Sequence, residues 1–155
     1  MTFTIGLLSI FASLHIPSRI GWQWGYLATK RAKARLAFAI MFIISGISHF
    51  TQTARFAAMI PPFFPNPITL VYISGLFEIL GAMGLVWPLA RVRRTAVIGT
   101  VLLLISVFPA NIYAAINNVT SPGALSSPLY LWLRLPLQAF FIWWVVWAGR
   151  EEVVS

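Results

Sequence analysis

The chain has 155 residues, of which 59% are apolar and only 9% charged, and it contains no cysteine. Its mean hydropathy of +0.85 lies outside the usual range of soluble domains and predicts a membrane protein with room for one bundle of spanning helices. The lack of cysteine excludes disulfides, thiolate nucleophiles and iron–sulfur ligation by this chain.

The net charge of +8 comes mainly from two basic clusters, each at the end of an apolar stretch. Basic residues at such positions mark the cytoplasmic ends of membrane helices, so they favour a multi-pass protein of the cell inner (plasma) membrane with a cytoplasmic C-terminus. We expect the lipid bilayer as a partner and no nucleic acid, because no soluble surface remains to bind one. The clusters are Lys30, Arg31, Lys33 and Arg35, and Arg91, Arg93 and Arg94.

Residues 1–28 are predicted to form a separate N-terminal hydrophobic segment. Residues 2–16 are apolar but short for a full crossing, and Pro17 and Arg19 follow them. A secretory signal would need a basic start and a small-residue cleavage site, and neither is evident. We therefore favour an interfacial or half-inserted helix over a further span. His15, near its end, is expected to be an interfacial histidine.

Residues 29–155 are predicted to form an all-α, four-helix transmembrane bundle. A stiff outer loop is expected at residues 55–67, because proline cannot continue a helix and four prolines lie between positions 61 and 67. An uncharged loop rich in Ser, Pro and Gly is expected at residues 118–128. The four predicted spans are residues 36–53, 68–87, 95–117 and 129–148.

Each predicted span carries one strongly polar residue, namely His49, Glu78, Asn111 and Arg134. A charge in hydrocarbon costs about 2.5 to 3.5 kcal/mol on insertion scales, so these groups are expected to meet inside the bundle. Counting helix rise from the outer ends places them about 6 to 15 Å deep. The sequence thus predicts a ligand-binding site in the outer half of the bundle, with no metal in it, because two histidines and three acids at scattered positions do not make a ligand set.

Small residues surround these polar positions at helical spacing. Around Glu78 they are Ser74, Gly75, Gly81 and Ala82, which allow another helix to approach closely. The patterns Ser45-Gly46-x-x-His49 and Ser74-Gly75-x-x-Glu78 also match. Pro109, two residues before Asn111, would either free a carbonyl group near the site or simply bend its helix for packing.

Four motifs in order carry a resemblance to a known family. They are SGISHF at 45–50, IPPFFPNP at 60–67, SGLFEILGAMGLVWP at 74–88 and VFPANIYAAIN at 107–117. Together they resemble the DoxX-like family of small bacterial and archaeal membrane proteins, over residues 36–148. The resemblance implies a compact four-helix membrane bundle and a redox-associated role, since the namesake is similar to subunits linked with a quinone-reducing thiosulfate oxidation complex. It supplies no catalytic residues.

Three hypotheses about function remain open. The first is a non-catalytic or redox-associated subunit that binds a quinone or lipid in the polar pocket and works with a membrane or oxidoreductase partner. The second is a small membrane enzyme with Glu78 and His49 as acid and base. The third is a structural or assembly protein in which Glu78 and Arg134 form a buried pair. Quinone is the one cofactor considered, and a homo-oligomer is compatible with the small-residue faces.

Overall fold

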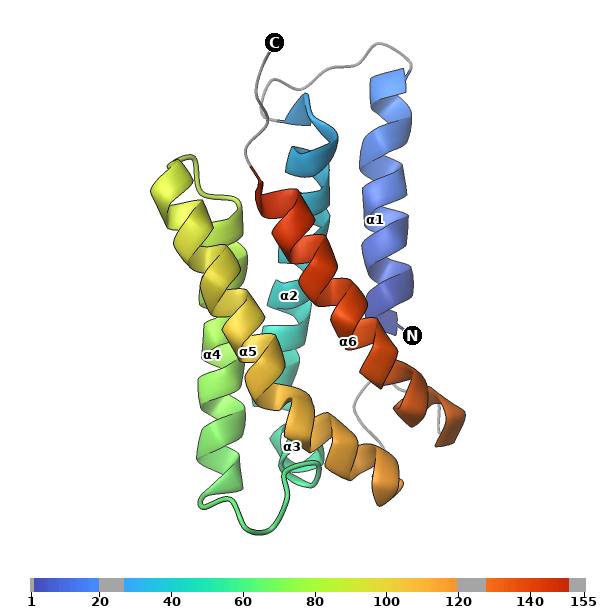
Figure 1. Cartoon of the computed structure of the whole chain (residues 1–155), viewed down its shortest axis with the longest axis vertical. Helices are drawn as coiled ribbons and strands as arrows, with labels where there is room; N and C mark the ends of the chain where they lie inside the picture. Colours follow the sequence, from blue (N-terminus) through green and yellow to red (C-terminus); the bar gives the residue numbers. More distant parts are fainter. Residues whose placement is uncertain (1, 20–26, 120–127, 151–155) are drawn as a thin grey trace.

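The computed structural model describes residues 2–19, 27–119 and 128–150 (Figure 1). The regular structure of these residues consists of helices, which confirms the predicted all-α class. The helices are α1 (Thr2–Arg19), α2 (Lys30–Thr51), α3 (Thr53–Ala57), α4 (Pro67–Leu85), α5 (Ala90–Ile116) and α6 (Pro128–Gly149).

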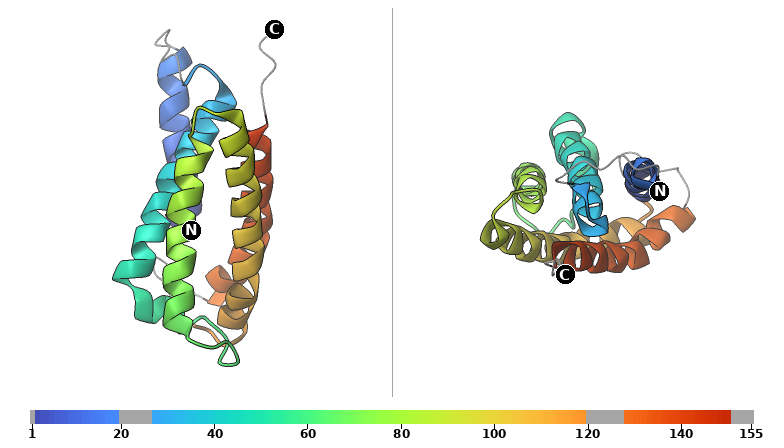
Figure 2. Two further views of the ribbon diagram at one scale, coloured as in Figure 1. Left: turned by 90° about the vertical axis from the view of Figure 1, so that its left-hand side faces the viewer. Right: turned by 90° about the horizontal axis from the view of Figure 1, so that it is seen from above.

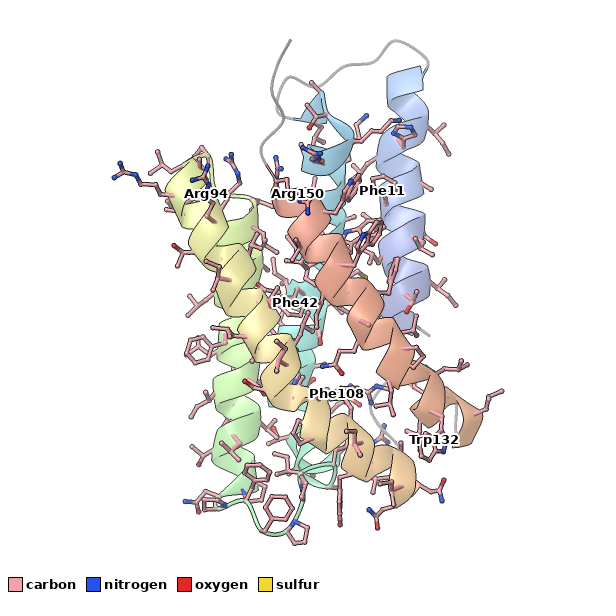
Figure 3. The ribbon with its side chains drawn as sticks, viewed as in Figure 1. Phe11, Phe42, Arg94, Phe108, Trp132 and Arg150 are labelled. Carbon is pink, nitrogen blue, oxygen red and sulfur yellow. The ribbon has the colours of Figure 1, made fainter. Side chains whose placement is uncertain are left out.

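The long helices pack in two layers, which are visible when the molecule is viewed from above (Figure 2). One layer contains α1, α2 and α4 side by side, and α5 and α6 lie obliquely across one face of it. The most extensive helix pair is α2 with α4. The buried core lies between the layers, around Phe38, Phe42 and Leu85 of the first layer and Trp144 and Val145 of α6. Figure 3 shows Phe42 at the centre of the molecule.

Four described helices, namely α2, α4, α5 and α6, are long and apolar enough to cross a membrane, with mean hydropathies between 1.4 and 2.0 over an 18-residue window. Their bundle indicates a membrane protein, as the composition predicts. The N-terminal helix α1 is a shorter apolar helix over residues 3–16. It lies along one half of α2, with its N-terminal end near mid-height of the bundle (Figure 1).

Helix α1 is firmly packed against the rest of the bundle. Leu7 is fully buried, and the Phe3 ring lies 4.8 Å from the Phe141 ring of α6, centroid to centroid. Phe11 makes an edge contact with Trp144, with centroids 5.2 Å apart. These contacts bury an apolar stripe of α1 against α2 and α6, so the N-terminal helix shares the core of the bundle.

Two helices begin earlier than predicted. α2 begins at Lys30 rather than at residue 36, and α5 begins at Ala90 rather than at residue 95. Hydropathy marks where apolar residues begin, whereas lysine and arginine are themselves good helix formers. Both basic clusters therefore lie within helices. The Thr29 hydroxyl caps α2 by accepting a hydrogen bond from the Ala32 amide at 3.1 Å.

The predicted outer loop at residues 55–67 is wrong at its beginning, because α3 occupies Thr53–Ala57. The chain breaks from α2 at Gln52, whose φ and ψ are −128° and 34°. The hydroxyl of Thr53 then donates to the carbonyl of His49 at 2.8 Å and starts a separate short helix. The proline-rich stretch that follows is not helical, and it ends at Asn66 in a left-handed conformation directly before Pro67, the first residue of α4.

Candidate functional site

Helices α2 and α4 cross closely at two glycines, and this crossing positions the candidate site. A Cβ atom added to Gly46 would lie 2.8 Å from the carbonyl oxygen of Gly75. A Cβ atom added to Gly75 would lie 2.7 Å from the Cβ atom of His49. Only glycine fits at either position without a shift of the helices. The two matching sequence patterns, Ser-Gly-x-x-His and Ser-Gly-x-x-Glu, therefore face each other across this crossing.

The crossing brings His49 and Glu78 together, as predicted. Nδ1 of His49 lies 3.7 Å from Oε2 of Glu78, and both residues are buried. Nδ1 is also 2.9 Å from the carbonyl oxygen of Ser45, which can only accept a hydrogen bond, so Nδ1 donates to it. Oε2 of Glu78, however, is buried with no hydrogen-bond partner among the described residues.

Arg134 of α6 approaches this pair from the second layer. The Arg134 side chain lies near enough to His49 and Glu78 for an electrostatic interaction with both. Within the described part of the chain, the ion-pair contact of Glu78 is made with His49, and Arg134 does not come within ion-pair distance of the carboxylate. The guanidinium Nη1 instead points toward the sulfur of Met59, 4.0 Å away. Three ionisable side chains from three helices thus form one cluster without a direct Glu78–Arg134 pair.

The outer side of the cluster is covered by two residues of α3 and the turn after it. The Phe56 ring stacks on the imidazole of His49, with centroids 3.9 Å apart and planes inclined by 13°. Met59 is buried and lies against Arg134. We call Phe56 and Met59 the outer cover. Sequence reasoning missed it, because Phe56 and Met59 belong to a segment that was expected to form a loop.

Asn111, the fourth predicted residue, belongs to a neighbouring pair. Its Nδ2 donates to Oε1 of Gln138 on α6 at 2.8 Å, and Nε2 of Gln138 donates to the carbonyl oxygen of Leu104 on α5. This polar clamp joins α5 and α6, and α5 changes direction part-way along its length (Figure 1). Sequence reasoning missed Gln138, although it lies four residues after Arg134 and so on the same helix face.

The donor set suits hydrogen bonding better than metal ligation. Among the described residues, no group of three or more His, Asp and Glu side chains lies close enough together to hold a metal ion. The cluster offers the imidazole of His49, the carboxyl group of Glu78 and the guanidinium group of Arg134. Such a combination can bind a polar head group or exchange a proton with it.

The DUF8561 family, described as a domain of unknown function, matches residues 38–149. The chain belongs to this family. The match contains all four predicted site residues and Gln138, the outer cover and the two glycines of the crossing, whereas α1 lies outside it. No curated protein and no solved structure matches the chain.

Proposed function

We propose that this DUF8561 protein is a non-catalytic or redox-associated subunit that binds the head group of a quinone or lipid at the cluster of His49, Glu78 and Arg134. The observation that carries the proposal is the buried oxygen of Glu78 without a hydrogen-bond partner among the described residues. A buried polar atom without a hydrogen bond is costly, and a chain built for stability alone would gain by replacing it. Its presence favours a group that is completed by a ligand.

A quinone carbonyl suits the cluster in chemical terms. Arg134 supplies N–H donors to a carbonyl oxygen, and Nε2 of His49 can accept from a hydroxyl group, because Nδ1 donates to the Ser45 carbonyl. Glu78 can take or release one of the two protons that accompany the two-electron reduction of a quinone to a quinol, with the electrons supplied by a redox partner. The apolar flanks of the bundle would hold the hydrophobic tail.

The outer cover would control access to this site. Phe56 lies against His49 and Met59 lies against Arg134, so a head group that enters from this side displaces them. Both belong to a short helix and turn that Gln52 separates from α2. Methionine is unbranched and adapts readily to a new neighbour. A small rotation of α3 would open the cluster without disturbing the α2–α4 crossing.

The arrangement of basic residues supports a location in the cell inner membrane with the C-terminus in the cytoplasm. The first residues of α2 and α5 and the last residues of α6 lie at the same end of the bundle, where Arg94 and Arg150 are seen together (Figure 3). Positive charge favours the cytoplasmic side of a membrane protein. The cluster would then lie in the outer half of the bilayer. A redox partner, as the DoxX-like resemblance implies, would have to meet the protein within the membrane.

The proposal is tested by extracting the full-length protein, purified in mild detergent, and analysing bound quinones by mass spectrometry. Wild type is expected to retain quinone, or to take it up when ubiquinone or menaquinone is added, and Glu78→Gln and Arg134→Gln to lose it. Arg55→Gln is the matched control, because Arg55 is exposed and interacts with Gln52 of its own segment. A wild-type protein that binds no quinone under either condition would refute the proposal.

A structural role is the second candidate, and the α2–α4 crossing favours it. His49 and Glu78 lie at the closest approach of the most extensive helix pair, where they could fix the helix register. In that case Glu78→Gln would leave the activity of an associated complex intact, and no ligand would be found. The same set of variants therefore separates the two functions.

A further inference from the structure

A second feature of the molecule lies away from the polar cluster. A cavity of about 460 Å³ opens on the surface between α4 and α5. It is mostly apolar, and its lining includes Phe77, Leu80, Gly84, Arg91, Val92 and Gly99. We call it the α4–α5 groove. Since both helices are long and apolar enough to cross a membrane, the groove would face the hydrocarbon region of a bilayer.

Glycines give the groove its shape. At Gly84 the helices touch, because a Cβ atom there would lie 2.6 Å from the Cβ atom of Ala96. At Gly99 a Cβ atom would meet nothing within 4 Å. The groove is therefore wide next to Gly99 while the helices stay in contact at Gly84. From Arg91 to Thr100, two of its lining residues, α5 rises about 14 Å. That length matches roughly half of a hydrocarbon core about 30 Å thick, which is one leaflet.

One end of the groove is basic. Arg91 lines it, and Arg93 and Arg94 follow in the first turns of α5. Arg93 is held by its own loop, since its guanidinium donates to the carbonyl oxygens of Trp87 and Pro88 at 3.2 and 2.7 Å. Arg91 is exposed, and none of the described residues that line the groove is acidic. An occupant should therefore carry negative charge at this end and a hydrophobic chain below it.

We propose that the α4–α5 groove binds one anionic phospholipid, with its phosphate at Arg91 and an acyl chain along Leu80, Gly84 and Gly99. The charge, the apolar lining and the one-leaflet length together match this class of ligand. A second copy of the chain fits less well. A two-fold axis along the membrane normal would bring the same residues of both copies to the same depth, so Arg91 would face Arg91. The proposal is independent of the polar cluster.

The test is native mass spectrometry of the full-length protein from mixed micelles containing phosphatidylglycerol or phosphatidylcholine. Wild type should retain one phosphatidylglycerol and little phosphatidylcholine. Arg91→Gln should weaken phosphatidylglycerol binding about fivefold, as expected for one basic residue near an anionic surface. Gly99→Leu should abolish the bound lipid by filling the open space beside α5. Lys30→Gln is the matched control, since it removes one charge at the same end of the bundle but outside the groove.

The results can overturn the proposal in three ways. If wild type retains both lipids equally, the charge of Arg91 does not make the groove select an anionic lipid. Equal weakening by Lys30→Gln and Arg91→Gln would show a diffuse surface attraction in place of a site. A wild-type dimer that Gly99→Leu converts to a monomer would show that the groove is an interface between copies. Circular dichroism of each variant establishes that it is folded, and Gly99→Ala replaces Gly99→Leu if the larger side chain prevents folding.

Discussion

Nδ1 of His49 lies 3.7 Å from Oε2 of Glu78, in the place where two glycines allow α2 and α4 to approach most closely. The distance between the two ionisable groups is thus set by backbone contact and not by a strong direct bond between them. Any change that moves the helices apart should therefore affect both the fold and the cluster.

Gly75→Ala is expected to destabilise the protein by about 1 to 3 kcal/mol, because the added methyl group would overlap with the Cβ atom of His49. Gly99→Ala is the matched control. It lies within α5 where no atom would meet the new methyl group, so it should be neutral or stabilise the helix by up to about 1 kcal/mol. Unfolding of both variants in mixed micelles, followed by circular dichroism, measures the difference. Equal stabilities would show that the crossing is not tightly packed.

Phe56→Ala is expected to expose the imidazole of His49, because the phenyl ring stacks directly on it. His49 should then react several-fold faster with diethyl pyrocarbonate, as measured by mass spectrometry of peptides. His15, which packs near Phe11 of α1, is present in the same sample and should react at an unchanged rate. If His49 reacts at the wild-type rate in Phe56→Ala, the outer cover does not control access to the cluster.

The polar clamp between Asn111 and Gln138 is expected to couple α5 to α6. Interhelical hydrogen bonds in membrane proteins have average coupling energies of about 0.6 kcal/mol and reach about 1.7 kcal/mol. A double-mutant cycle with Asn111→Ala and Gln138→Ala should give a value in this range. Gln138→Ala should be the more harmful single change, because it also leaves the carbonyl of Leu104 without the side-chain donor. Additive effects would mean that the two side chains do not interact.

Trp144 and Trp143 are adjacent in the sequence, but one is buried and the other exposed, so comparing them tests the packing of the core. Trp144 is 5% exposed and its Nε1 donates to the carbonyl oxygen of Ala34 at 3.2 Å, whereas Trp143 is 56% exposed. Trp144→Phe should therefore lower the free energy of unfolding by about 1 kcal/mol or more through loss of this hydrogen bond. Trp143→Phe should have little effect. Thermal unfolding by circular dichroism compares them, and a larger effect at Trp143 would contradict the structure.

Much of the fold could be predicted from hydropathy, because a bilayer demands about 20 apolar residues in each spanning helix. The helix ends could not, since the basic residues of 30–35 and 91–94 continue their helices and hydropathy ignores them. Helix α3 was missed for a different reason. Its five residues are held by local hydrogen bonds after the break at Gln52, and so short an element leaves no periodic pattern.

The candidate site was predicted in part. The cost of burying charge in hydrocarbon predicted that His49, Glu78, Asn111 and Arg134 would converge, and the structure brings His49 and Glu78 into contact. The sequence could not show that His49, and not Arg134, contacts the Glu78 carboxylate, because this depends on the rotation of α6 about its axis. Asn111 forms a hydrogen bond with Gln138. Gln138 was not predicted as a site residue, because it lies in a mostly hydrophobic stretch of the sequence. The depth of a residue along its helix can be counted from the sequence. The direction in which its side chain points around the helix axis can be known only from the structure.

The N-terminal helix α1 packs closely against the bundle, although it lies outside the region that the family matches. Gly6 lies so close to the Met41 sulfur that a methyl group there would come within 2.7 Å of it, yet residue 6 falls well before the matched region that starts at residue 38. A protein cut at that border would present the bare side of Phe38 and Met41 to solvent or lipid. The region matched by the family, residues 38–149, is thus smaller than the packed unit of the structure, which includes α1.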